Sequence, residues 1–74
     1  MNNEEMLEEG TIVYRNPDYP DALIGRDCQD GRAVYSYRKM VECLMKDGMS
    51  ETDAIEWIDY NVLGLRGDGF PIVV

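Results

Sequence analysis

Two amphipathic helical segments joined by a four-residue link constrain this 74-residue chain more than any other feature. The first spans about residues 36–46, where apolar residues recur with the 3.6-residue period of an α-helix: Tyr37, Met40, Val41, Leu44 and Met45. The second begins at Ser50, because an acidic residue three positions after a serine is typical of a helix N-cap. Its predicted buried stripe consists of Ala54, Ile55, Ile58 and Val62. A link as short as 47–50 makes the two helices antiparallel neighbours.

The residues before this helical pair predict a β-hairpin. Two short apolar runs, 22–25 and 32–35, flank a loop that contains Asp30-Gly31. Glycine accepts the positive φ that a hairpin turn requires. The runs 11–14 and 70–74 are rich in β-branched and aromatic residues and predict two further strands. We therefore expect an α+β fold, with a small antiparallel sheet (the hairpin plus N- and C-terminal strands) packed against a two-helix antiparallel hairpin.

The first ten residues differ in composition from the rest of the chain. They contain Glu4, Glu5, Glu8 and Glu9 and no basic residue. Adjacent like charges without an apolar face argue against a stable helix. We expect a flexible acidic arm at 1–10, followed by a single α+β domain at 11–74.

Charge and residue content exclude several classes of function. Seven Lys and Arg residues against fifteen Asp and Glu give a net charge of −8, which repels nucleic acid and anionic lipid. The chain has no histidine, so the commonest zinc ligand and the usual base near neutral pH are missing. We therefore expect no catalytic residues, no cofactor, no metal, and no direct contact with nucleic acid or a membrane.

The cysteines and the first residues indicate a compartment. Cys28 and Cys43 are too few for a disulfide framework, so we expect two free, buried thiols in a reducing environment, with a single bridge between them as the alternative. The first residues lack the basic and then apolar pattern of a signal peptide, and no apolar run is long enough to span a bilayer. These features predict a cytoplasmic protein.

An ordered series of short motifs runs from residue 22 to residue 61. The motifs are Ala22-Leu23-Ile24-Gly25, Asp30-Gly31-Arg32, Val34-Tyr35, Lys39-Met40-Val41-Glu42, Leu44-Met45, Asp47-Gly48-Met49-Ser50 and Asp53-Ala54-Ile55-Glu56-Trp57-Ile58-Asp59-Tyr60-Asn61. In this order they resemble short proteins of low-GC Gram-positive bacteria and of their phages and mobile elements, which also end in an apolar strand, so the resemblance covers about 53 residues, 22–74. The chain departs from that pattern at 62–67, which lacks the expected proline-aromatic segment. The resemblance implies no particular activity, but its setting implies an inhibitor of a host or defence enzyme, acting in the cytoplasm of a bacterial host cell.

The candidate partner-binding site is the acidic face of the second helix. Asp53, Glu56 and Asp59 recur every three residues, about 4.5 Å apart along the helix axis, and Tyr60 lies among them. Carboxylates in such a row imitate the phosphates of a duplex to a basic groove. Further acidic residues expected to steer the partner are Glu51, Asp27 and Asp30. An ordinary solvated helix face explains the same residues.

Two functions are compatible with these patterns. The leading hypothesis is a non-enzymatic acidic protein that binds and inhibits a nucleic-acid-handling host or defence enzyme, as an anti-CRISPR-like protein or DNA mimic. Its partner is then a protein with a basic nucleic-acid-binding surface. The alternative is a small self-associating accessory or structural protein, because the apolar C-terminal run 72–74 has no charged residue to prevent strand pairing between two copies in a homodimer.

Overall fold

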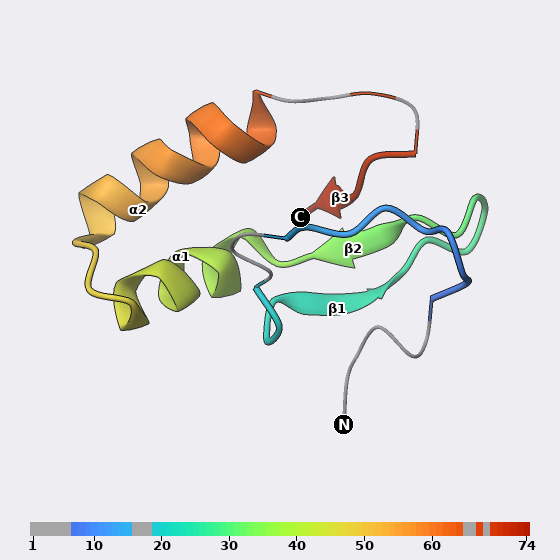
Figure 1. Cartoon of the computed structure of the whole chain (residues 1–74), viewed down its shortest axis with the longest axis horizontal. Coiled ribbons are helices and arrows are strands. Elements are labelled where there is room, and N and C mark those ends of the chain that lie inside the picture. Colours follow the sequence, from blue (N-terminus) through green and yellow to red (C-terminus); the bar gives the residue numbers. More distant parts are fainter. Residues whose placement is uncertain (1–6, 16–18, 65–66, 68) are drawn as a thin grey trace.

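The computed structural model describes residues 7–15, 19–64, 67 and 69–74 (Figure 1). In chain order the elements are β1 (Leu23–Arg26), β2 (Ala33–Tyr35), α1 (Tyr37–Lys46), α2 (Glu51–Ile58), the π-helical turn η2 (Asp59–Leu63) and β3 (Ile72–Val73). The strands form one sheet in the order β1-β2-β3, and the two helices run antiparallel beside it. The predicted α+β class, a small sheet with a two-helix hairpin, is confirmed.

β1 and β2 form the predicted antiparallel hairpin. At its tip Gly31 adopts a φ of 77° and donates its N–H to the carbonyl of Asp27 (3.0 Å). The register shifts between Leu23 and Gly25, and Ile24 at this irregularity is exposed. The turn chemistry of Asp30-Gly31 therefore predicts the hairpin correctly, while the first strand begins and ends one residue later than expected.

Both helices begin at a serine cap. The Ser50 hydroxyl accepts the N–H of Asp53 (3.1 Å), as predicted, and the Ser36 hydroxyl accepts the N–H of Lys39 (3.3 Å). The link between the helices turns at Gly48, whose φ of 106° lies in the left-handed region that favours glycine. The turn at Gly48 therefore ends α1 and allows α2 to run antiparallel to it.

The core lies between the helical pair and the sheet. Its buried side chains are Tyr19, Ala22, Leu23, Ala33, Tyr35, Met40, Val41, Leu44, Ala54, Ile58 and Val62. Three side chains of the predicted stripes differ from expectation: Met45 is exposed, and Tyr37 and Ile55 are only half-buried. Met45 follows the exposed Arg38 by seven residues, so both lie on one side of α1, away from the core.

The predicted N-terminal strand is wrong. Residues 11–15 form no strand, and the N–H of Tyr14 is donated to the side-chain hydroxyl of Tyr35 (3.2 Å) rather than to a neighbouring strand. The ring of Tyr14 packs on Tyr35 (centroids 4.8 Å apart) and edge-on against Tyr19 (6.1 Å). Aromatic packing therefore holds this segment against the sheet.

The predicted arm at 1–10 falls mostly outside the described residues, which begin at Leu7. Leu7 is half-buried and packs against the core, whereas Glu8, Glu9 and Gly10 are exposed.

The C-terminal strand forms, but it is shorter than predicted and runs parallel to β2. Ile72 pairs with Val34, and Val73 pairs with Tyr35. The expectation of an entirely antiparallel sheet is therefore wrong. The reason lies in the connection: α1 leads away from the end of β2, and after α2 the chain re-enters the sheet at the end where β2 begins (Figure 1).

Candidate functional site

The exposed face of α2 carries carboxylates that make no ion pair within the described part of the chain. Asp53 and Glu56 are exposed and lie three residues apart on one side of the helix. Glu51 lies in the first turn, where the positive end of the helix dipole favours a negative charge. Asp53 and Glu56 therefore share one exposed side of α2, whereas Glu51 lies seven residues before the buried Ile58 and so on the other side of the helix.

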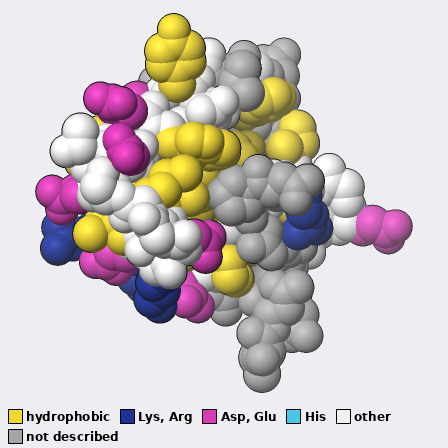
Figure 2. Space-filling model, turned by 60° about the vertical axis from the view of Figure 1, so that its left-hand side comes forward, with side chains coloured by type: hydrophobic (Ala, Val, Ile, Leu, Met, Phe, Trp, Pro, Cys, Tyr) yellow, Lys and Arg dark blue, Asp and Glu magenta, His cyan; other side chains and the backbone are white. Residues whose placement is uncertain are grey.

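The two helices differ in charge. From Glu51 to Leu63 the chain carries only acidic charges, whereas α1 carries Arg38, Lys39 and Lys46 beside Glu42. Arg38 and Glu42 form an ion pair on α1 (3.4 Å). Figure 2 shows that acidic side chains lie around exposed hydrophobic ones at the end of the molecule built by the helices. The uncompensated negative charge of this end belongs to α2.

Asp59 is held by a contact between the helices. The Tyr37 hydroxyl donates a hydrogen bond to Oδ1 of Asp59 (3.2 Å). Burial, together with this negatively charged acceptor, raises the pKa of Tyr37 above its ordinary value. The helical period assigns Tyr37 only to the core and gives no sign of this bond, because nothing in the sequence links positions 22 residues apart.

Tyr60 is the most exposed large hydrophobic side chain of the described residues, at 85%. It lies on η2, a π-helical turn that the sequence did not predict. The Asn61 side chain donates to the Trp57 carbonyl (2.9 Å) and ties the turn to α2. At the end of the turn, a Cβ on Gly64 would lie 2.8 Å from the carbonyl oxygen of Tyr60, so only glycine fits there. Single π-helical turns inside helices occur often at functional sites.

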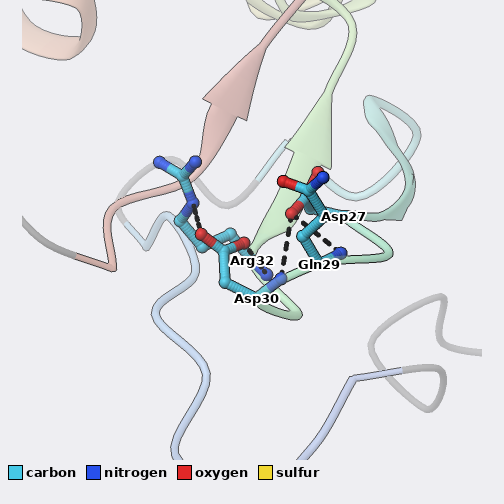
Figure 3. Close-up of polar contacts among 4 residues, drawn as sticks. All are labelled: Asp27, Gln29, Asp30 and Arg32. Carbon is cyan, nitrogen blue, oxygen red and sulfur yellow. Dashed lines mark hydrogen bonds and ion pairs between the residues drawn. The ribbon is translucent and has the colours of Figure 1, made fainter.

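Asp27 and Asp30 belong to the hairpin tip, where both make local contacts (Figure 3). Oδ2 of Asp27 accepts the N–H groups of Gln29 (3.2 Å) and Asp30 (3.0 Å). Oδ2 of Asp30 pairs with Nε of Arg32 (2.9 Å). The pKa of Asp30 lies below its ordinary value, first because of its hydrogen bond with Asp27 and then because of Arg32. These two carboxylates stabilise the turn.

The structure does not bring the hairpin acids to the face of α2. The tip and α2 lie towards opposite ends of the longest axis, along which the molecule extends 34 Å (Figure 1). The sequence does not distinguish a carboxylate in a tight turn from one on a distant helix. Only the tertiary structure shows that Asp27 and Asp30 lie far from the carboxylates of α2.

The remaining candidate chemistry is limited. Within the described residues no group of three or more His, Cys, Asp or Glu side chains converges as metal ligands would, and no described helix is long and apolar enough to cross a membrane. Both cysteines are free. Cys43 is half-buried, and burial raises its pKa, but Cys28 is exposed on the hairpin loop, so the prediction of two buried thiols is wrong for Cys28.

Comparisons with protein-family models, with curated proteins and with solved structures find no match to this chain.

Proposed function

We propose that this chain is a non-enzymatic acidic protein that binds and inhibits a nucleic-acid-handling host or defence enzyme, as an anti-CRISPR-like protein or DNA mimic. The contact surface is the face of α2 and η2 formed by Asp53, Glu56 and Tyr60. One observation carries the proposal: Tyr60 is 85% exposed beside carboxylates that no described cation neutralises. The partner is a protein with a basic nucleic-acid-binding surface.

Tyrosine and carboxylates suit such a contact for different reasons. A tyrosine ring buries a large area while fixing few rotatable bonds, and aromatic residues are enriched at interface centres. Unpaired carboxylates can each accept a charge-assisted hydrogen bond from Arg or Lys of the partner. Asp53 and Glu56 lie seven and four residues before Tyr60, so the ring provides area and the charges provide selection for a basic surface.

The other predicted residues take smaller roles. Asp59 already accepts the Tyr37 hydroxyl, so its carboxylate meets a partner in a fixed orientation. Glu51 lies in the first turn of α2 on the other side of the helix from Asp53 and Glu56, so it adds only to the overall negative charge of this end. Asp27 and Asp30 at the far end of the molecule steer only weakly, because charges beyond about 8 Å are largely screened at physiological ionic strength.

A pull-down from a Gram-positive bacterial lysate tests the proposal. The tagged chain is presented at about 0.1 M and about 1 M salt, between which the screening length falls from about 10 Å to about 3 Å. We expect capture of a nucleic-acid-binding enzyme at low salt only. Duplex DNA added as competitor should release it, and the captured enzyme's activity should fall when the chain is added.

The matched variants are Asp53→Lys with Glu56→Lys, and Glu8→Lys with Glu9→Lys. Both pairs change the net charge equally, and all four residues are exposed. Only the α2 pair should abolish capture. Equal capture by both pairs, or capture that duplex DNA does not compete with, refutes the proposal and leaves the face of α2 as solvated surface.

Self-association through β3 is the second candidate, favoured by the position of β3 at an edge of the sheet. Light scattering over a wide concentration range tests it. A dimer that Val73→Lys dissociates supports this candidate, and a monomer at the highest concentration contradicts it.

A further inference from the structure

A groove separates η2 from the segment that forms β3. It has a volume of about 250 Å³, and its described lining includes the apolar side chains of Val62, Leu63, Phe70, Ile72 and Val73. Arg32 is the one cation among the described lining residues, and no carboxylate of α2 lines the groove. This surface is therefore separate from the face of α2, and a ligand could occupy it whether or not the proposed function holds.

The Arg32 side chain is oriented towards this groove. Its Nε pairs with Asp30 at 2.9 Å, and the guanidinium lies beside the chain that leads into β3 (Figure 3). The side chain is 36% exposed, so its charge is only partly screened by solvent. Because Asp30 takes the Nε side, the two terminal nitrogens stay available, and no described residue pairs with them. A guanidinium presented in this way matches a carboxylate with two parallel hydrogen bonds.

The neighbouring strand edge is open along the described residues. Val74 donates its N–H to Tyr35 (2.9 Å) and accepts the N–H of Tyr37 (2.9 Å), so it faces β2. Successive residues of a strand direct their backbone groups to opposite edges, which turns the N–H and C=O of Val73 away from β2. No backbone group of the described residues hydrogen-bonds them.

We propose that this groove binds an extended apolar peptide by its C-terminal carboxylate. The peptide adds to β3 by main-chain hydrogen bonds to Val73, an apolar side chain enters the groove, and the carboxylate pairs with the terminal nitrogens of Arg32. Charge complementarity selects this occupant: on a chain of net charge −8, the groove presents a cation.

Register sets the direction of the peptide. Val34 pairs with Ile72 in the parallel β2–β3 ladder, so Arg32 lies at the end where both strands begin. A peptide strand whose carboxyl end reaches Arg32 must therefore run antiparallel to β3. A free carboxyl terminus fits better than an Asp or Glu side chain. Arg32 precedes β2, and its side chain lies beside the start of β3 rather than along the edge of β3.

Calorimetric titration of the full chain with a synthetic peptide tests this site. The probe is acetylated Ser-Thr-Val-Thr-Val with a free C-terminal carboxylate, and its C-terminal amide is the matched ligand. We expect the amide to bind at least about tenfold more weakly, as the loss of a charge-assisted contact predicts. In nuclear magnetic resonance spectra, the free acid should shift the amide signal of Val73 and the Nε signal of Arg32.

Two arginine variants complete the experiment. Arg32→Met should bind acid and amide equally weakly, whereas Arg26→Met, an exposed arginine of β1 outside the groove lining, should bind as the unaltered chain does. Circular dichroism confirms that both variants fold.

Equal affinity for acid and amide, or unchanged binding by Arg32→Met, overturns the proposal. A dimer that protects the Val73 amide and binds no peptide overturns it in favour of a second copy. The Asp53→Lys and Glu56→Lys changes should leave peptide binding unaltered, so this site and the proposed function can fail separately.

Discussion

At the residue scale, removing either of two tyrosine hydroxyls should change the free energy of unfolding, but in opposite directions, because their surroundings differ. The Tyr19 side chain is 1% exposed, and its hydroxyl is buried without a hydrogen-bond partner in the described structure. The Tyr37 hydroxyl donates to Asp59. We expect Tyr19→Phe to raise the free energy of unfolding by about 1 kcal/mol, because an unsatisfied buried polar group is removed. Tyr37→Phe should lower it by about 0.5 to 1 kcal/mol, because a hydrogen bond is lost.

Urea denaturation followed by circular dichroism measures both changes. Tyr60→Phe is the control, since its hydroxyl lies on a side chain that is 85% exposed and should leave the midpoint unaltered. A loss of stability in Tyr19→Phe would show that its hydroxyl has a partner after all. An unaltered midpoint in Tyr37→Phe would show that the bond to Asp59 contributes nothing.

At the element scale, the helical hairpin depends on the backbone conformation at Gly48. Its φ of 106° lies in a region that residues with a Cβ rarely adopt, although no atom within 4 Å would meet a Cβ there. Gly48→Ala should therefore destabilise the fold by about 1 to 2 kcal/mol through backbone strain alone.

Gly25→Ala supplies the matched comparison. A Cβ at Gly25 also meets nothing within 4 Å, and its φ lies outside the left-handed region. We expect its free energy of unfolding, measured by thermal denaturation, to stay within about 0.5 kcal/mol of that of the unaltered chain. Equal losses at both positions would show that side-chain crowding or strand propensity, and not φ, determines the cost.

The same scale shows why some elements were predictable and others were not. Helical periodicity, Ser50 and Asp30-Gly31 act through near neighbours in the chain, and the sequence predicts the elements that depend on them. The run 11–14 predicts only an extended segment, since the partner of the Tyr14 N–H is the side chain of Tyr35. The parallel direction of β3 depends on where α2 and the following loop return the chain, which no local pattern encodes.

The candidate site divides along the same line. A helical period places Asp53 and Glu56 on one exposed face, and the structure agrees. The distant contacts were not predictable: Tyr37 with Asp59, the π-helical turn beneath Tyr60, and Arg32 at the groove each depend on segments that meet only in the folded chain. Asp27 and Asp30 were grouped with α2 by charge alone, and the fold separates them.

At the scale of the whole molecule, several groups retain their protons more strongly in the folded chain than outside it. Burial raises the pKa of Tyr14 and Tyr37, with added effects of Tyr35 and Asp59 respectively. Burial also raises the pKa of Tyr19 and of the Cys43 thiol. All four are neutral when protonated, so desolvation opposes their ionisation in the same direction.

These raised pKa values predict that stability falls in alkaline solution. The unfolded chain releases these protons near the ordinary values, about 8.5 for cysteine and about 10 for tyrosine, while the folded chain still holds them. The unfolded state then binds fewer protons than the folded state. The free energy of unfolding is therefore not reduced by these groups below about pH 8.5, and it decreases as the pH rises towards the raised pKa values of the folded chain. The added charge also increases the repulsion within a chain that already carries −8.

Urea midpoints at about pH 7.5 and about pH 10.5 measure the decrease. Tyr14→Phe should reduce it, because the ring packing stays and one ionising group is gone, whereas the exposed Tyr60→Phe should not. Equal midpoints at the two pH values would mean that these groups ionise as readily in the folded chain as in the unfolded one.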